Sequence, residues 1–131
     1  MNQKQKEAIN YFFVHIFNQI LSWEEQSFKD MGLRDVSLRE LHVIEAVCAL
    51  KKTDENRMSS VAQYLSITAG SLTTAVNTLV KKGYLERETA ENDKRVVLIF
   101  PTEKAEEVNR IHSGFHSAMI EQIGELTTEG E

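Results

Sequence analysis

Residues 68–82 carry side chains that fit one face of a helix, and this face is small, hydroxylated and basic at its end. At 100° per residue, Leu72, Val76 and Leu79 fall on the opposite, apolar side. Hydroxyl and amide groups of this kind contact phosphates and base edges, and small side chains let a helix enter the major groove of duplex DNA. The candidate DNA contacts in and around this helix are Ser59, Thr68, Gly70, Ser71, Thr73, Thr74, Asn77, Thr78 and Lys81. The alternative is a solvated helix face without a ligand.

A second group of candidate residues follows in the segment 90–95, which joins two apolar, β-branched runs. Asp93, Lys94 and Arg95 lie there, and an arginine fits the narrow, electronegative minor groove of DNA. An aspartate two residues earlier can hold the guanidinium by paired hydrogen bonds and set its direction. A helix-turn-helix followed at once by a basic hairpin is a winged helix, so order and spacing together favour DNA binding over a solvated turn.

The hydrophobic pattern predicts five helices and one hairpin. Apolar residues from Ile9 to Leu21 follow three- and four-residue spacing, and such an aromatic helix must pack against another element or another chain. Ser37 and Glu40 form a capping-box pattern at the start of the second helix. We expect a mainly α fold with a small β-hairpin wing in a single domain, 1–131. A winged helix-turn-helix at 37–100 would be flanked by N- and C-terminal dimerisation helices at 1–30 and 102–131.

The element boundaries are predicted from capping and turn residues. Ser59 and Thr68 are predicted N-caps of the third and fourth helices, and Gly83 is the predicted end of the fourth. In the polar loop 51–57, only Asn56 is a residue type that favours unusual backbone angles.

The hairpin strands are expected at 84–89 and 96–100. Pro101 is expected to stop the second strand, and Thr102 to cap the last long helix.

Composition excludes several classes of protein. The 131 residues fit one domain, and the net charge of −5 resides in 103–131, so it does not oppose a basic surface elsewhere. The segment 8–23 is too polar for a membrane span and lacks the features of a secretion signal. Cys48, the single cysteine, lies on an apolar stripe, which predicts a buried thiol and suits a reducing cytoplasm. No phosphate-binding loop or nucleophile motif indicates an enzyme.

The sequence resembles the MarR family of bacterial winged-helix repressors over about residues 5–125. The resemblance lies in MSSVAQYLSITAGSLTTAVNTLVKKGYLERE at 58–88 and ENDKRVVLIFPTEKA at 91–105, with the wing pattern of Asp93 and Arg95. The chain departs from the family where Thr74 and Thr78 stand in place of a frequent basic residue. The resemblance implies a cytoplasmic transcription regulator, a repressor in the family's usual role, that binds an inverted-repeat operator as a homodimer.

A finer resemblance is to the fatty-acid-biosynthesis repressor subgroup, in RELHVIEAV at 39–47, KKGYLER at 81–87 and RIHSGFHSAMIEQI at 110–123. It implies control of fatty-acid synthesis genes with acyl-acyl carrier protein as effector, and no required cofactor. An acyl chain would need an apolar slot, for which Phe13, Phe17, Phe28 and Phe115 are candidates. The same residues would equally fill a plain dimer core.

Two other functions remain alternatives. His112 and His116 share a helix face, and with His42 and Glu24 they form a ligand set suited to zinc, as the resemblance to zinc-responsive relatives also implies. Structural hydrogen bonds of these histidines are the competing interpretation, and we expect no metal. A winged helix that docks on a protein is the alternative from another class.

The C-terminal sequence differs from the family pattern, in which one more helix usually follows the long one. Here LTTEGE ends the sequence, and Thr127 resembles the cap of a helix that does not follow. We expect either a truncated chain or a homodimer that relies more on the first helix.

Overall fold

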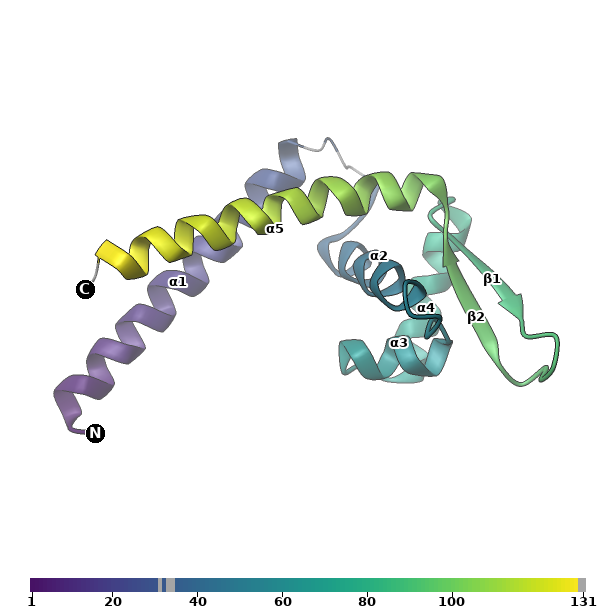
Figure 1. Cartoon of the computed structure of the whole chain (residues 1–131), viewed down its shortest axis with the longest axis horizontal. Helices are drawn as coiled ribbons and strands as arrows, with labels where there is room; N and C mark the ends of the chain where they lie inside the picture. Colours follow the sequence, from purple (N-terminus) through teal and green to yellow (C-terminus); the bar gives the residue numbers. More distant parts are fainter. Residues whose placement is uncertain (31, 33–34, 130–131) are drawn as a thin grey trace. The chain divides into compact units, whose positions relative to one another are not determined.

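The computed structural model describes residues 1–30, 32 and 35–129, with side chains to residue 125. The chain divides into two compact units, Met1–Leu33 with His112–Glu131, and Arg34–Ile111. The second unit contains α2 (Leu38–Lys51), α3 (Met58–Leu65), α4 (Ala69–Lys81), β1 (Leu85–Thr89), β2 (Val97–Pro101) and the first residues of α5 (Glu103–Glu129). Figure 1 shows its three short helices grouped beside the hairpin. The predicted mainly α fold with a hairpin wing is confirmed, whereas the single domain stays a prediction.

The core of this unit lies between α2, α3, α4 and the base of the hairpin. Its fully buried side chains include Leu41, Ile44, Val47, Val61, Leu72, Val76, Leu79, Leu85 and Ile99. Complete burial of one such side chain contributes roughly 1.5–3 kcal/mol. Because α4 buries Leu72, Val76 and Leu79, its opposite face must lie toward solvent, as the helical periodicity predicts.

The helix starts agree with the predicted caps at Ser37, Thr68 and Thr102 but not at Ser59. Ser37 and Glu40 form the reciprocal capping box, and the Thr68 hydroxyl accepts a hydrogen bond from the Ser71 N–H at 3.1 Å. The prediction for Ser59 is wrong, since α3 begins at Met58 after an extended Arg57 that makes no side-chain cap. Arg57 is extended because it forms an isolated β-bridge with Leu98, and this pairing overrides the local preference for a serine cap.

The turns also deviate from expectation at one point. Gly83 adopts a φ of +85° after the last turn of α4, as expected of the residue that ends a helix. In the loop before α3, however, Asp54 rather than Asn56 adopts the left-handed conformation, with a φ of +56°. Asn56 is buried and hydrogen-bonds to Ile99 of the sheet instead.

The wing is a two-stranded antiparallel sheet in which Leu85 pairs with Pro101 and Arg87 with Ile99. The second strand thus ends at Pro101, one residue later than predicted. On the outer side of β2, the Ile99 N–H donates to the Asn56 carbonyl at 2.9 Å, and the Asn56 side-chain amide donates to the Ile99 carbonyl at 2.6 Å. Asn56 therefore satisfies both outward backbone groups of a buried residue and joins the loop to the wing.

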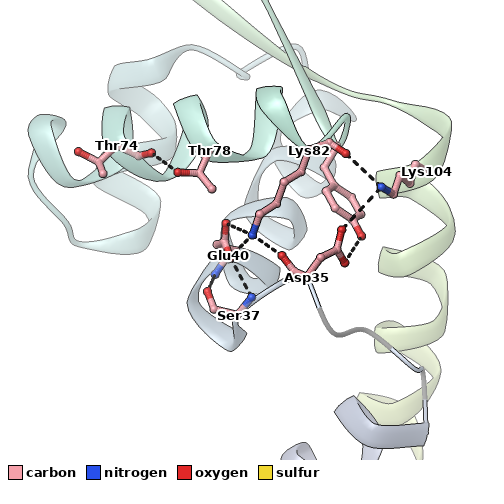
Figure 2. A network of polar contacts seen from close by, with 8 residues as sticks. Asp35, Ser37, Glu40, Thr74, Thr78, Lys82 and Lys104 are labelled. Atoms are coloured by element: carbon pink, nitrogen blue, oxygen red, sulfur yellow. Dashed lines mark hydrogen bonds and ion pairs between the residues drawn. The ribbon is translucent and has the colours of Figure 1, made fainter.

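A polar network fixes the C-terminal end of α4 against the start of α2 (Figure 2). The Lys82 ammonium donates to the Asp35 carbonyl and lies 3.2 Å from a Glu40 carboxylate oxygen. Glu40 also accepts the Ser37 N–H in the capping box. Burial opposes the ionised form of Glu40, but the bonds from Ser37 and Lys82 outweigh it and lower the pKa of the carboxyl group. The Glu40 carboxylate thus joins the start of α2 to the residue that follows α4.

Tyr84 and Lys104 extend this network to the last helix. The Tyr84 hydroxyl donates to an Asp35 carboxylate oxygen at 3.2 Å, and the Lys104 ammonium donates to the Lys82 carbonyl at 3.0 Å. Burial, followed by the bond to Asp35, raises the pKa of Tyr84 to about 12, so its hydroxyl stays protonated. Thr102 accepts a hydrogen bond from the Ala105 N–H at 3.4 Å, which agrees with its predicted role as a cap.

The other unit consists of α1 (Gln3–Asp30) and most of α5. No residue of α1 is buried, and Tyr11, Phe13 and Phe17 are 72%, 69% and 61% exposed. Thr127, whose place in the sequence resembles a helix cap, instead lies within α5, which continues to Glu129. Among the described residues, neither of these long helices is apolar enough to cross a membrane.

We predict that Asn56→Ala lowers the free energy of unfolding by about 1–3 kcal/mol, since it leaves the buried Ile99 carbonyl without its amide donor. Urea denaturation at fixed protein concentration measures this change. Gln63→Ala, which removes an exposed amide from α3, is the matched control and should change stability by less than about 0.5 kcal/mol. Equal effects of the two substitutions would contradict the role given to Asn56.

We predict that Glu40→Gln lowers the free energy of unfolding by about 1–3 kcal/mol at pH 7, because it removes the charge that Lys82 and Ser37 stabilise. The folded pKa of Glu40 lies below its usual value of 4.5. This contribution is therefore complete above about pH 4.5 and is lost as the pH falls through the folded value.

Urea titrations of both proteins from pH 7 to pH 3 measure the convergence of their stabilities. Glu88→Gln, on the exposed face of β1, controls for the loss of one negative charge. A difference between wild type and Glu40→Gln that persists unchanged at pH 3 would refute the assignment.

Candidate nucleic-acid interface

The exposed face of α4 carries the residues that the helical pattern selects. Thr73, Thr74, Asn77 and Lys81 are exposed, whereas Ser71 and Thr78 are half-buried. Gly70 is exposed as well, and a Cβ there would meet nothing within 4 Å. No neighbour in the described chain therefore demands a glycine at this position, and its smallness leaves open space in front of the helix.

The threonine hydroxyls of α4 are oriented by the helix itself. Thr73 donates to the Ala69 carbonyl at 2.9 Å, Thr74 to the Gly70 carbonyl at 3.1 Å, and Thr78 to the Thr74 carbonyl at 3.2 Å. Each hydroxyl proton is engaged in this way, so each oxygen keeps lone pairs for an external donor. The face accordingly offers acceptors and methyl groups, which suit base amino groups and the thymine methyl group.

The wing contains the predicted aspartate–arginine pair. The Arg95 Nε lies 3.1 Å from Asp93 Oδ1 and its Nη2 lies 3.2 Å from Oδ2, while the Arg95 N–H also donates to Oδ1 at 3.0 Å. The guanidinium and then the backbone N–H lower the pKa of Asp93. Arg95 remains 91% exposed along its side chain, and Lys94 beside it is also exposed. The carboxylate therefore orients an arginine that is accessible to a ligand.

A groove of about 270 Å³ brings the wing together with the starts of α3 and α4. Ser59, Thr73 and Arg95 all line it, so three predicted contacts share one surface. Arg57 lines it too, and sequence reasoning missed this residue. Its position in the sequence gave a signal, because Arg57 lies just before a predicted helix. A helix N-terminus favours anions such as phosphate, and an adjacent arginine would add a positive charge to such a site.

A second groove of about 440 Å³ lies between the start of α2 and α4. Ser71, Thr74 and Thr78 line it together with Arg39, a further residue that the sequence reasoning missed. Arg39 is exposed, and its position on the second helix gave no sign that it would lie beside α4.

Arg87 is the third missed arginine. It lies on β1, and its Nη1 donates a hydrogen bond to the Asn77 side-chain oxygen on α4. Strand alternation contained the signal, because Leu85 is buried and Arg87 shares its face of the strand. Arg39 on α2, Arg57 directly before α3 and Arg87 on β1 thus each lie beside residues of α4.

One of the four predicted effector residues, Phe115, lines a described cavity of the unit that contains α1 and most of α5. A cavity of about 270 Å³ lies between the C-terminal part of α1 and α5, and Phe115 lines it with Trp23 and Met119. Phe13 and Phe17 are exposed on α1 and Phe28 is half-buried, and none of the three lines this cavity. Helical periodicity predicts that these side chains share a face of the helix, but it does not predict which of them line a cavity.

The histidine set is distributed over both units. The imidazole rings of His112 and His116 lie 4.1 Å apart on α5, and Phe115 packs near both. Glu24 belongs to α1 in the same unit, whereas His42 belongs to α2 in the other. Metal binding by these residues stays an untested alternative to the expectation that the protein needs no metal.

Cys48 is buried, as its place on an apolar stripe predicts. Burial, with a smaller contribution from Glu106, raises the pKa of its thiol to about 11. The thiolate, which is the reactive form, is therefore scarce at neutral pH, and this thiol is unsuited to redox sensing.

Comparison with known proteins identifies the family. A model of the MarR family matches residues 34–96. The structure of Streptococcus pneumoniae FabT in complex with DNA is 34% identical, covers 95% of this chain and 90% of that chain, and has a TM-score of 0.76. No curated protein matches the chain significantly.

More distant structures share the fold. The Staphylococcus aureus MepR–DNA complex is 17% identical over 91% of this chain and 94% of that chain, with a TM-score of 0.65. The zinc-responsive MarR family member ZitR from Lactococcus lactis is 22% identical, covers 86% of this chain and 83% of that chain, and has a TM-score of 0.63. The chain thus belongs to the MarR family of DNA-binding transcription regulators.

Proposed function

We propose that this protein is a repressor that binds an inverted-repeat operator as a homodimer, with α4 in the major groove and the wing in the adjacent minor groove. The main observation behind this proposal is that Arg95, which is exposed and oriented by Asp93, lines the same groove as Ser59 and Thr73. An arginine that is already held by Asp93 loses little conformational entropy when it enters a minor groove.

The distribution of charge supports contact with phosphates. The acidic excess lies in 103–131, whereas Arg39, Arg57, Arg87 and Lys94 lie around or beside the exposed face of α4 and the wing. Local potential rather than net charge governs the approach of a polyanion. Each phosphate that these cations neutralise releases counterions, so binding must weaken as salt increases.

The exposed aromatic residues of α1 support a homodimer. Phe13 and Phe17 belong to a helix with no buried residue, and one aromatic side chain removes about 150–250 Å² from water when it is buried. A second copy of this chain would cover them. Two-fold pairing would also place two α4 helices about 34 Å apart, one turn of DNA, as an inverted repeat requires.

We predict that Arg95→Ala weakens operator binding by at least about 1 kcal/mol, or about fivefold in Kd, because it removes the group inserted in the minor groove. Fluorescence anisotropy with a labelled duplex over a series of salt concentrations gives both Kd and the salt dependence. Arg110→Ala, an exposed arginine on α5, is the control for the loss of one positive charge.

Unchanged affinity of the Arg95→Ala protein would remove the wing from the mechanism. Binding by the wild type that hardly depends on salt would instead favour the protein-docking alternative, because apolar contacts release few counterions.

We further propose that the repressed genes serve fatty-acid synthesis and that acyl-acyl carrier protein is the effector. The resemblance to the fatty-acid-biosynthesis repressor subgroup and the 34% identity to FabT support this assignment. The apolar residues Trp23, Phe115, Ala118 and Met119 line one part of this cavity and could contact an acyl chain, while Gln26, Ser27, Asp30 and Gln122 line the rest. An acyl chain bound there would favour one of two dimer conformations and so change the match to adjacent grooves.

We predict that native mass spectrometry of freshly isolated protein detects an added acyl mass, and that Ala118→Phe abolishes it by filling the cavity that Ala118 lines. Ser113→Phe, on an exposed position of α5 that does not line the cavity, should leave the added mass unchanged. An acyl mass on both variants would place the ligand elsewhere. A zinc mass in its place would favour the metal-responsive alternative.

A further inference from the structure

A side-chain hydrogen bond joins Arg87 on β1 of the wing to the amide of Asn77 on α4. Leu85 is buried and Arg87 follows two residues later, so strand alternation turns Arg87 toward the same side. Its Nη1 donates to Asn77 Oδ1 across ten residues of sequence. Glu86 and Glu88 lie on the opposite face of the strand and are exposed. We propose that Arg87 is a positioning residue that fixes the orientation of the Asn77 amide for reading one base pair.

The chemistry of the two groups explains why the contact sets an orientation. A guanidinium only donates hydrogen bonds, whereas a carboxamide has one accepting end and one donating end. If the Asn77 amide flipped, its NH₂ group would meet the Arg87 donors, so the oxygen must face Arg87. The NH₂ group is thereby directed away from the strand, and the second lone pair of the oxygen stays available.

This orientation matters for base recognition because asparagine reads adenine through two bonds. Its NH₂ group donates to adenine N7 and its oxygen accepts from adenine N6, so only one orientation of the amide makes both bonds. The second lone pair of Asn77 Oδ1 can accept from the base while the first accepts from Arg87. Without the arginine, both amide orientations are populated, and the flipped one presents a donor to a donor.

This inference rests on the proposed DNA-binding function and adds a source of specificity to it. An amide–adenine pair discriminates against other bases by about 5- to 150-fold. Asn77→Ala should abolish this discrimination at one base pair in each half-site. Arg87→Met, which keeps much of the apolar stem, should reduce discrimination at the same base pair by at least about twofold, because about half of the Asn77 amides then have the wrong orientation, and should leave the other positions unchanged.

The test uses a duplex selected by the wild-type protein from a random-sequence library. Kd values are measured by anisotropy for all single base-pair variants of that duplex, with wild type, Asn77→Ala, Arg87→Met and the double variant. The double variant should discriminate as Asn77→Ala does, because Arg87 acts through Asn77. Glu86→Gln, from the opposite face of β1, is the control and should preserve the pattern. Circular dichroism verifies that each variant is folded.

The outcomes separate this inference from the function on which it rests. Loss of discrimination at one shared base pair supports it. If Arg87→Met weakens binding uniformly and reduces the salt slope by about one, Arg87 is a direct phosphate contact and the inference is wrong. The inference also fails if Arg87→Met retains full discrimination at the base pair read by Asn77. If the wild type selects no duplex at all, the proposed DNA-binding function itself fails.

Discussion

The complete burial of Leu72, Val76 and Leu79 is the constraint on which the remaining features of the unit Arg34–Ile111 depend. A helix that buries one stripe has no freedom to rotate about its axis, so the opposite side must present its hydroxyl and amide groups to solvent. The Thr68 cap fixes the first turn of α4, and Lys82 fixes the residue after its last turn. The wing then follows directly from Gly83 and Tyr84, which places Arg87 and Arg95 at the edges of that exposed face.

Local features of this molecule could be predicted from the sequence, because the interacting residues are close together along the chain. The capping box of Ser37 and Glu40 spans three residues, and the Asp93–Arg95 pair spans two. Residue preferences are strong at such short separations, where chain geometry leaves few alternatives. The helical stripe of α4 was predictable for the same reason.

Contacts between distant residues could not be predicted from the sequence. Asn56 bonds to Ile99 across 43 residues, and Lys82 reaches Asp35 across 47, so neither is visible in any local pattern. The wrong cap at Ser59 has the same origin, since the pairing of Arg57 with Leu98 decides where α3 begins. The aromatic residues of α1 show the limit most clearly, because periodicity establishes a shared face but not what covers that face.

Cys48 gives this fold a built-in reporter of its own opening. It is the single cysteine of the chain, it is buried, and burial raises the pKa of its thiol to about 11. A thiol reagent can reach it only when α2 separates from its neighbours, so the rate of labelling measures how often the core opens. A ligand that binds the closed form would slow that reaction at Cys48, which lines neither groove of the proposed DNA-contacting surface, so that surface needs no label.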